Sequence, residues 1–168
     1  MLIDAHVHLY PADLCAEPIA WAAARGESHW TKLCTRRRRD GRPVQSFPTV
    51  DELLAAMDAA GVDRAVLLGW YWEKSEVCVW HNRFYASCVR AHPDRLSAFA
   101  TIQPAAGREV TLAEIRRAHD EGLVGLGELS PHSQNYAVAD PVFADALALA
   151  AELRMPVNLH VTDPTSRA

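Results

Sequence analysis

The stretch Leu2-Ile3-Asp4-Ala5-His6-Val7-His8 decides the fold, because it alternates apolar and polar side chains. Successive side chains on a β-strand point to opposite faces, so Ile3, Ala5 and Val7 share one face. Asp4, His6 and His8 share the other face. Such a strand packs its apolar face against covering helices and turns its polar face toward the interior of a barrel. The two histidine rings therefore project from the same side of the predicted strand.

Strand and helix patterns alternate along the rest of the chain. Further strands are predicted at 64–69, 96–102, 124–129 and 157–161, and helices at 49–61, 76–90, 111–121 and 140–154. Two of the helices open with predicted capping boxes, Thr49–Glu52 and Thr111–Glu114, and a third opens with Asp140-Pro141, an N-cap followed by proline. This alternation predicts an α/β fold, with parallel strands joined by right-handed crossovers.

The position of the polar residues favours a barrel over a doubly wound sheet. His6, His8, Glu128 and His160 all fall at the carboxyl ends of predicted strands, which form the catalytic rim of a (β/α) barrel. The first strand is also not followed by a glycine-rich phosphate turn. A complete barrel has eight strands and about 250 residues. The 168 residues therefore predict an incomplete TIM-like (β/α) barrel with about five parallel strands.

Residues 9–48 interrupt the alternation, because they show no clean period and several prolines and glycines punctuate them. We expect a long loop excursion over the barrel mouth, in which residues 16–24 could form a short helix. The excursion contains the basic run Arg36–Arg39. This run is short and has no interleaved aromatic residue, which favours a solvated loop over a phosphate-binding groove.

Four residues carry the predicted chemistry, because imidazole nitrogens and carboxylate oxygens are common ligands of divalent metals. His6 and His8 can reach one cation together, although two polar residues near a strand end would give the same pattern. Glu128 ends an apolar strand, where an unpaired charge is costly, and either a cation or a salt bridge would remove that cost. His160 repeats the histidine placement on the fifth strand, where a satisfied core histidine is the alternative to a ligand.

Three segments, in this order, resemble the metal-dependent amidohydrolase superfamily, and in particular its Amidohydro-2 branch, with TatD-type hydrolases as relatives. They are Ile3-Asp4-Ala5-His6-Val7-His8, Gly127-Glu128-Leu129-Ser130-Pro131 and Val157-Asn158-Leu159-His160. The resemblance covers essentially the whole chain. It implies one or two divalent ions, zinc in the first place with manganese or iron as alternatives. His6, His8 and His160 would hold the ion, with Glu128 near it or bridging a second one.

The same resemblance implies a hydrolase in which the metal activates water to attack a C–N, ester or lactone bond of a small molecule. Some members of the superfamily use such a site for decarboxylation or hydration instead. The aromatic pair Trp70 and Tyr71 follows the second strand, and His132 follows the fourth, so we expect these residues to contact substrate, although aromatic residues in a loop can also cover the core. No residue is assigned a catalytic role. His81 is expected in the outer ring of helices.

The chain departs from the family pattern at its end. The family also has a histidine after the sixth strand and an aspartate after the eighth, whereas this sequence stops at Ala168. We therefore expect residues 1–168 to be the N-terminal part of a single metal-dependent hydrolase domain. Its open sheet edges predict self-association or pairing with a missing C-terminal portion. A non-catalytic half-barrel that serves as a binding or assembly subunit is the first alternative, and a phosphoesterase or TatD-type nuclease is the second.

Composition narrows the classes of partner. The net charge of −4 argues against a nucleic-acid-binding protein, and no apolar run is long enough to cross a bilayer, so we expect neither nucleic acid nor membrane as a partner. An acidic residue, Asp4, stands where a secretory signal would carry basic residues, which predicts a cytoplasmic protein. A small-molecule substrate is the remaining expectation.

Overall fold

Five parallel strands form one sheet in the computed structural model, which describes residues 1–161. The strands are β1 (Ile3–Val7), β2 (Arg64–Leu67), β3 (Leu96–Ala100), β4 (Gly125–Leu129) and β5 (Val157–Leu159). They lie side by side in sequence order, and every neighbouring pair is parallel. A doubly wound sheet reverses its strand order at a switch point, whereas a (β/α) barrel adds its strands in one direction. The strand order therefore confirms the predicted incomplete barrel.

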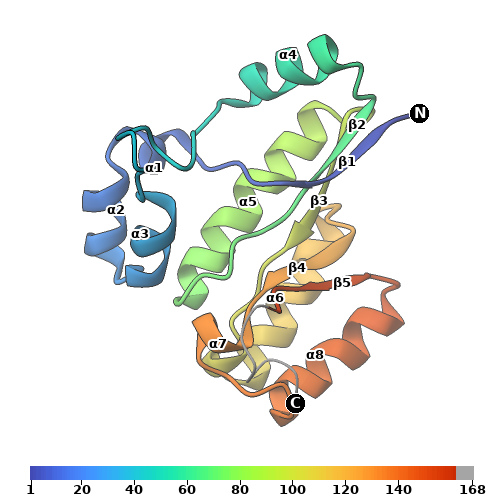
Figure 1. Ribbon diagram of the computed structural model, residues 1–168. Helices are drawn as coiled ribbons and strands as arrows, with labels where there is room; N and C mark the ends of the chain where they lie inside the picture. The colour runs from blue at the N-terminus through green and yellow to red at the C-terminus, as the bar shows by residue number, and fades with distance from the viewer. Residues whose placement is uncertain (162–168) are drawn as a thin grey trace.

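Helices connect the strands and cover one face of the sheet. The connecting helices are α4 (Val50–Ala60), α5 (Ser75–Ala91), α6 (Arg108–Asp120) and α8 (Pro141–Glu152), with the short η1 (Pro104–Ala106) and α7 (Pro131–Gln134) beside them. Helix α5 packs against β3 and α6, and α6 packs against α8. Figure 1 shows these helices following the curve of the sheet. The main hydrophobic core lies between the helices and the strands, and its fully buried residues include Leu67, Ala98, Ile115 and Phe143.

Local sequence signals explain where two of these helices begin and end. The Thr49 side chain accepts a hydrogen bond from the Glu52 backbone, and the Glu52 carboxylate accepts one from the Thr49 backbone, so the first predicted capping box is confirmed. Gly61 ends α4 with a left-handed φ of 67°. Asp140 accepts from the backbone of Val142 and caps α8, as predicted.

The second predicted capping box is wrong. Helix α6 begins at Arg108, one turn before Thr111, and Gly107 occupies the N-cap position with a φ of 98°. Thr111 is buried within the first turns of the helix, and its hydroxyl donates to the backbone carbonyl of Gln103. The threonine therefore ties α6 to η1 instead of capping a helix. A pattern of threonine and glutamate three residues apart is the same in both situations, so only the packing separates them.

The excursion between β1 and α4 is more ordered than the sequence indicates. Residues 12–34 fold into α1 (Ala12–Ala16), α2 (Pro18–Arg25) and α3 (Ser28–Cys34), where the sequence suggested a loop with one short helix at 16–24. Figure 1 shows these three helices gathered beside the end toward which β1 runs. They have a hydrophobic cluster of their own, in which Trp30 of α3 and Trp72 of the β2–α5 loop are fully buried. Because three short helices pack through aromatic side chains, the segment does not show the regular period of a single long helix.

Two glutamates fasten this excursion to the start of α5. The Glu27 carboxylate accepts hydrogen bonds from the backbone N–H groups of Glu73 and Lys74 at 2.8 and 3.0 Å. The Glu73 carboxylate in turn accepts from the backbone of His29 at 2.7 Å and from the Ser28 hydroxyl at 3.2 Å. Each carboxylate satisfies free N–H groups at the beginning of the other segment's helix. The contact fixes α3 against the mouth of the half-barrel.

The two outer strands leave apolar side chains in solvent. Within residues 1–161, β1 pairs only with β2 and β5 pairs only with β4. Ile3 on β1 is 44% exposed, and Val161, just after β5, is 49% exposed. Among the residues that the structure describes, no helix combines the length and the apolar character that a membrane span requires.

Candidate metal centre

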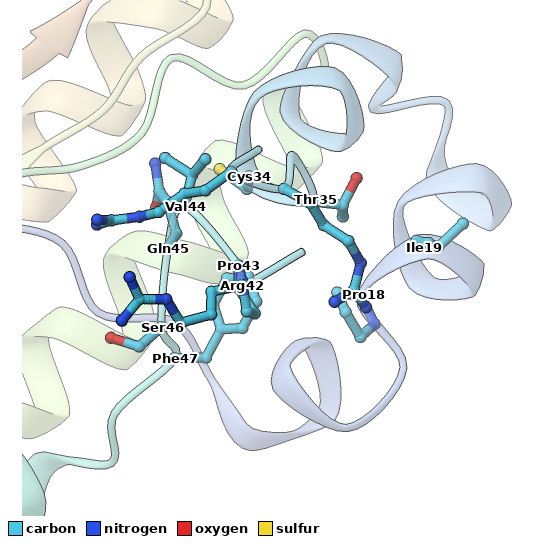
Figure 2. Close-up of a pocket in the computed structure, with 12 residues that line it drawn as sticks. Pro18, Ile19, Cys34, Thr35, Arg42, Pro43, Val44, Gln45, Ser46 and Phe47 are labelled. Atoms are coloured by element: carbon cyan, nitrogen blue, oxygen red, sulfur yellow. The ribbon is translucent and has the colours of Figure 1, made fainter. Parts of the chain in front are cut away.

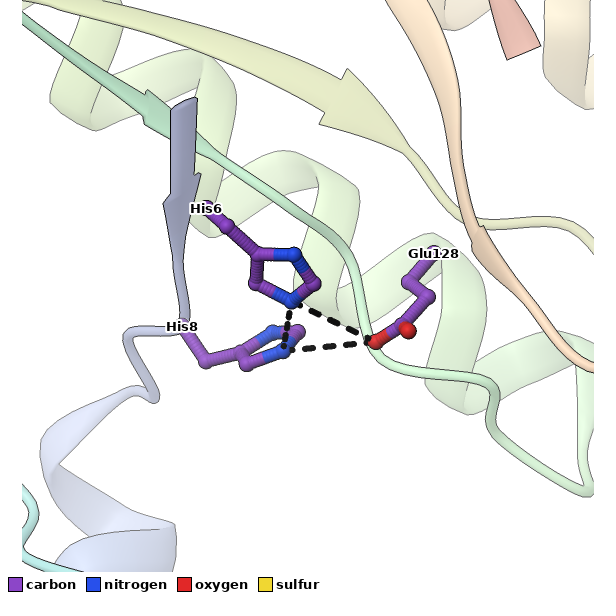
Figure 3. Close-up of side chains that lie close together, drawn as sticks. All are labelled: His6, His8 and Glu128. Atoms are coloured by element: carbon purple, nitrogen blue, oxygen red, sulfur yellow. Dashed lines mark hydrogen bonds and ion pairs between the residues drawn. The ribbon is translucent and has the colours of Figure 1, made fainter. Parts of the chain in front are cut away.

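Two strands bring three ligand-type side chains together at the carboxyl edge of the sheet. His6 is the last residue but one of β1 and His8 follows the strand, and their Nε2 atoms lie 3.1 Å apart. Glu128 on β4 directs Oε2 to 3.4 Å from His8 Nε2 and to 3.7 Å from His6 Nε2. Figure 3 shows the three side chains converging from the two strands on one point. Their ligand atoms all lie within 4.8 Å of one another.

The hydrogen bond on the far side of the His8 ring determines its tautomer. His8 Nδ1 lies 2.9 Å from the backbone carbonyl oxygen of Leu68, which can only accept, so Nδ1 carries the proton. In the neutral form of His8, Nε2 is therefore the nitrogen that presents a lone pair to the cluster. A backbone carbonyl in this role is the usual arrangement behind a metal-bound histidine, because it holds the ring and raises its basicity.

Tyr85 holds the Leu68 carbonyl in place. Its hydroxyl donates to Leu68 O at 2.7 Å, and it accepts from the backbone N–H of Leu9 at 3.2 Å. The phenol is fully buried. Apolar residues with helical spacing in α5, namely Val77, Trp80, Phe84 and Cys88, predict its inward face, and this pattern does not mark Tyr85. A buried tyrosine beneath a pair of histidines is therefore a supporting residue that sequence reasoning missed.

His81 lies beside Tyr85 and is also part of this support. His81 lies on a helix of the outer ring, as predicted, and its side chain is fully buried. Its Nε2 donates to the carbonyl of Leu9 at 2.8 Å, and its Nδ1 accepts from the indole of Trp72 at 2.9 Å. Burial lowers the pKa of His81 to about 3, so the ring is neutral. It joins the segment after His8 to the aromatic cluster of the excursion.

Glu128 is the electrostatic centre of the cluster. Its side chain is only 8% exposed, and His160 Nδ1 lies 2.7 Å from its Oε1. Burial by itself raises the pKa of the Glu128 carboxyl, but hydrogen bonds and positive charge from His8 and His160 outweigh burial and hold that pKa below its usual range. The carboxylate is thus ionised and lies between the histidines of the first strand and the histidine that follows the fifth.

Gly69, in the loop after β2, and Gly127, within β4, allow the carboxylate to reach this position. The backbone N–H of Gly69 donates to Gly127 O at 2.6 Å, and the N–H of Glu128 donates to Gly69 O at 2.7 Å. Gly127 has a φ of 139°, and a Cβ on it would lie 2.7 Å from the backbone oxygen of Asn158. Only glycine fits so close to the neighbouring strand with this conformation. The residue before Glu128 is therefore required for the close packing of β2, β4 and β5 under the cluster.

The aromatic pair Trp70 and Tyr71 backs the histidines. The two rings stack with centroids 4.2 Å apart, Trp70 meets the His8 ring at 5.4 Å, and Tyr71 meets the His160 ring at 5.1 Å. Both side chains are at least 96% buried. This arrangement orients the imidazoles, whereas contact of Trp70 and Tyr71 with a substrate stays a prediction.

Two further histidines are His132 on α7 and His29 on α3. His132 is exposed on α7 and lines a cavity of about 440 Å³ together with Tyr136. His29 of α3 places its Nε2 3.2 Å from the Ser133 hydroxyl, which joins the excursion to α7. Burial lowers the pKa of His29, and the nearby His132 and His160 lower it further. A role of His132 in substrate binding stays a prediction.

The donor set and its spacing fit a divalent transition metal. Two nitrogens bound to one zinc ion at about 2.0–2.1 Å in a tetrahedral arrangement lie roughly 3.4 Å apart. The separations of 3.1, 3.4 and 3.7 Å among His6, His8 and Glu128 match this value. Imidazole nitrogen with carboxylate oxygen suits zinc, iron or manganese, so the atoms present do not select one of these metals.

Comparisons with known proteins agree with the fold. A family model described as Amidohydrolase matches residues 3–168. No curated protein matches the chain significantly. Solved structures with the same fold include a 5-carboxyvanillate decarboxylase from Novosphingobium aromaticivorans with bound manganese and 3-methoxy-4-hydroxy-5-nitrobenzoic acid. It has a TM-score of 0.72 and 16% identity, and the match covers 99% of this chain and 52% of that one.

Two further solved structures also match the fold of this chain. A probable 2-pyrone-4,6-dicarboxylic acid hydrolase from Acinetobacter baumannii, with citric acid bound, has a TM-score of 0.60 and 18% identity over 95% of this chain and 49% of that one. A 2,6-dihydroxybenzoate decarboxylase from Rhizobium has a TM-score of 0.63 and 18% identity over 99% of this chain and 52% of that one. The chain spans about half the length of the solved structures that it matches.

Proposed function

The chain belongs to the amidohydrolase family, and from this premise we propose that it carries the divalent-metal site of an enzyme that hydrolyses or decarboxylates small organic acids. His6, His8 and Glu128 hold the ion in this proposal, and His160 completes the group through its contact with Glu128. The convergence of the three ligand atoms within 4.8 Å is the observation that carries it. A bound divalent cation supplies Lewis-acid polarisation and lowers the pKa of water toward about 7.

The chain's own residues prepare that chemistry. The Leu68 carbonyl holds the proton of His8 at Nδ1, so Nε2 is the nitrogen available to the ion. Glu128 is ionised and offsets part of the charge of a cation, and His160 holds one of its oxygens so that the other faces His6 and His8. Trp70 and Tyr71 exclude water from the side of the rings that they cover. Zinc is the ion expected from the sequence, and the manganese of the decarboxylase is an alternative for this chain.

The substrate class rests on the ligands of related structures. The hydrolase from Acinetobacter baumannii holds citric acid, and the decarboxylase from Novosphingobium aromaticivorans holds a nitrobenzoic acid. Both ligands are carboxylic acids, which a cationic centre attracts. A panel of lactones, esters, amides, aromatic carboxylic acids and phosphodiesters distinguishes hydrolysis, decarboxylation and phosphoesterase activity.

Metal content tests the site directly. We expect about one equivalent of a divalent transition metal per chain after gentle purification, and loss of retention in the double variant His6→Ala/His8→Ala. His119→Ala is the matched control, because His119 is an exposed histidine on α6. Elemental analysis by mass spectrometry measures all three proteins. Equal metal in the double variant and the control would rule out the proposed ligands.

A non-catalytic binding or assembly subunit that keeps the metal ligands is the second candidate. This candidate predicts that the chain has no turnover on the substrate panel even when metal is bound. Addition of a polypeptide that carries the remaining barrel strands separates the two functions, since the enzyme requires activity to appear in the reconstituted barrel.

A further inference from the structure

The arginine run of the excursion is exposed to solvent, as the sequence indicated, and its backbone folds into a hairpin. Arg38 N donates to Arg42 O at 2.7 Å, Gly41 N donates to Arg38 O at 3.0 Å, and Val44 N donates to Arg36 O at 2.9 Å. Gly41 closes the turn with a φ of 82°, a conformation that glycine adopts without strain. Backbone pairing therefore fixes the direction of the arginines that follow α3.

The hairpin forms one wall of a cavity of about 700 Å³ (Figure 2). Figure 2 shows the segment from Arg42 to Phe47 facing Pro18 and Ile19 of α2 across the opening. The floor is apolar, and Phe47 stacks on the buried Trp30 with ring centroids 5.7 Å apart. Ile19 is 60% exposed and Val44 is 40% exposed, so two large apolar side chains of the wall lack cover within residues 1–161. Cavities that hold small ligands have volumes of about 300–1,000 Å³ and mostly apolar walls.

The charge at the opening is strongly positive. Residues 36–42 hold five arginines and one aspartate, a local charge of +4 in a chain whose net charge is −4. Arg37, Arg38 and Arg42 line the cavity. Asp40 pairs with Arg42 at 2.6 Å, and Arg37 donates to the carbonyl of Gly41, so no carboxylate of residues 1–161 neutralises Arg37 or Arg38. Guanidinium groups bind carboxylates through paired hydrogen bonds.

We propose that this cavity is a second ligand site, which binds a small organic acid with an apolar body and one carboxylate. The apolar body lies against Ile19, Val44 and Phe47, and the carboxylate lies at Arg38 with Arg37 beside it. A concave apolar floor suits a small molecule better than a polyanion, because nucleic acid requires an extended basic groove. The site shares no residue with the candidate metal site formed by His6, His8 and Glu128.

Titration calorimetry with naphthoate tests the proposal on the full chain at low ionic strength. The His6→Ala/His8→Ala background removes the metal site, so failure of the metal proposal leaves this result unaffected. We expect one saturable site, at least about tenfold weaker binding of the uncharged naphthamide, and a loss of similar size in Arg38→Gln. Arg39→Gln is the matched control, because Arg39 belongs to the same exposed run but does not line the cavity. Its affinity should stay within about twofold of the parent.

Other outcomes overturn the proposal. Equal affinity for naphthoate and naphthamide would show that the arginines do not recognise the charge. Equal weakening by Arg38→Gln and Arg39→Gln would show a diffuse surface attraction. Tighter binding of heparin than of naphthoate would assign the arginines to a polyanion. The variant Val44→Asp gives a second check, since a carboxylate on the wall should abolish naphthoate binding while the thermal melt remains cooperative.

Discussion

At the residue scale, the hydrogen bonds of two buried tyrosines show which one supports the candidate metal site and which one only packs in the core. Tyr85 and Tyr136 are both buried, but Tyr85 donates to the Leu68 carbonyl behind His8, whereas the Tyr136 hydroxyl has no hydrogen-bond partner in the described part of the chain. We expect Tyr85→Phe to lower the free energy of unfolding by about 1–3 kcal/mol, because the carbonyl loses a buried donor. Metal affinity should fall by about 10–100-fold, because the support behind His8 is weakened.

Tyr136→Phe is the control, since it removes a hydroxyl that forms no hydrogen bond and should not reduce stability or metal affinity. Chemical denaturation and competition with a chelator measure the two quantities. The assigned role of Tyr85 would be refuted if Tyr85→Phe bound metal as tightly as the parent protein while Tyr136→Phe bound it less tightly.

At the scale of elements, the contact between the excursion and α5 should contribute to stability in a pH-dependent way, because it involves the carboxyl group of Glu27. Burial raises the pKa of Glu27 to about 7, although the backbone N–H groups of Glu73 and Lys74 favour its ionised form. An unfolded glutamate titrates near ~4.3, so between these two values only the folded chain keeps this proton. The contribution of Glu27 to the free energy of unfolding therefore decreases as the pH rises toward about 7.

Thermal melts between about pH 5 and pH 8 measure this effect. We expect the melting temperature of the parent to fall relative to that of Glu27→Gln across this range. Glu52→Gln needs melts extended below pH 4.5 and should show the opposite sign there, because hydrogen bonds from Thr49 lower the pKa of Glu52 and its stabilisation is lost on protonation. A parent and a Glu27→Gln variant with parallel pH profiles would contradict the titration assigned to Glu27.

At the scale of the whole molecule, the main feature is the pair of outer strands, β1 and β5, each of which has one unpaired edge within residues 1–161. Ile3 and Val161 expose apolar surface at opposite edges, beside strands that pair on one side only within residues 1–161. We propose that these edges associate with another chain, because unpaired strand edges and apolar patches promote pairing. Light scattering should show concentration-dependent association of the 168-residue chain, and Ile3→Lys/Val161→Lys should reduce it.

Val124→Lys is the control for this experiment, because Val124 is 48% exposed but precedes β4, which has neighbours on both sides. The control should associate as the parent does. A parent chain that stays monomeric at every concentration and melts cooperatively would contradict association through the edges.

The sequence by itself determined the alternation of strands and helices, the strand-end positions of His6, His8, Glu128 and His160, and the caps of α4 and α8. These features depend on side-chain alternation and on hydrogen bonds within a few residues, which are local properties of a chain. Parallel strands then place their carboxyl ends at one edge, so residues 120 positions apart could be expected to meet there. The direct contact between His160 and Glu128 was not predicted in this form.

Only the tertiary structure decided which groups support the site and which charges remain unpaired. The rotation of α5 about its axis buries His81 and Tyr85 in place of Trp80 and Phe84, and the excursion meets α5 through Glu27 and Glu73. Arg38 is exposed, as the sequence indicated, but the hairpin of residues 36–44 also places it at a cavity, which the sequence did not indicate. Such contacts join segments far apart in the sequence and depend on shape and packing, so no local pattern in the sequence specifies them.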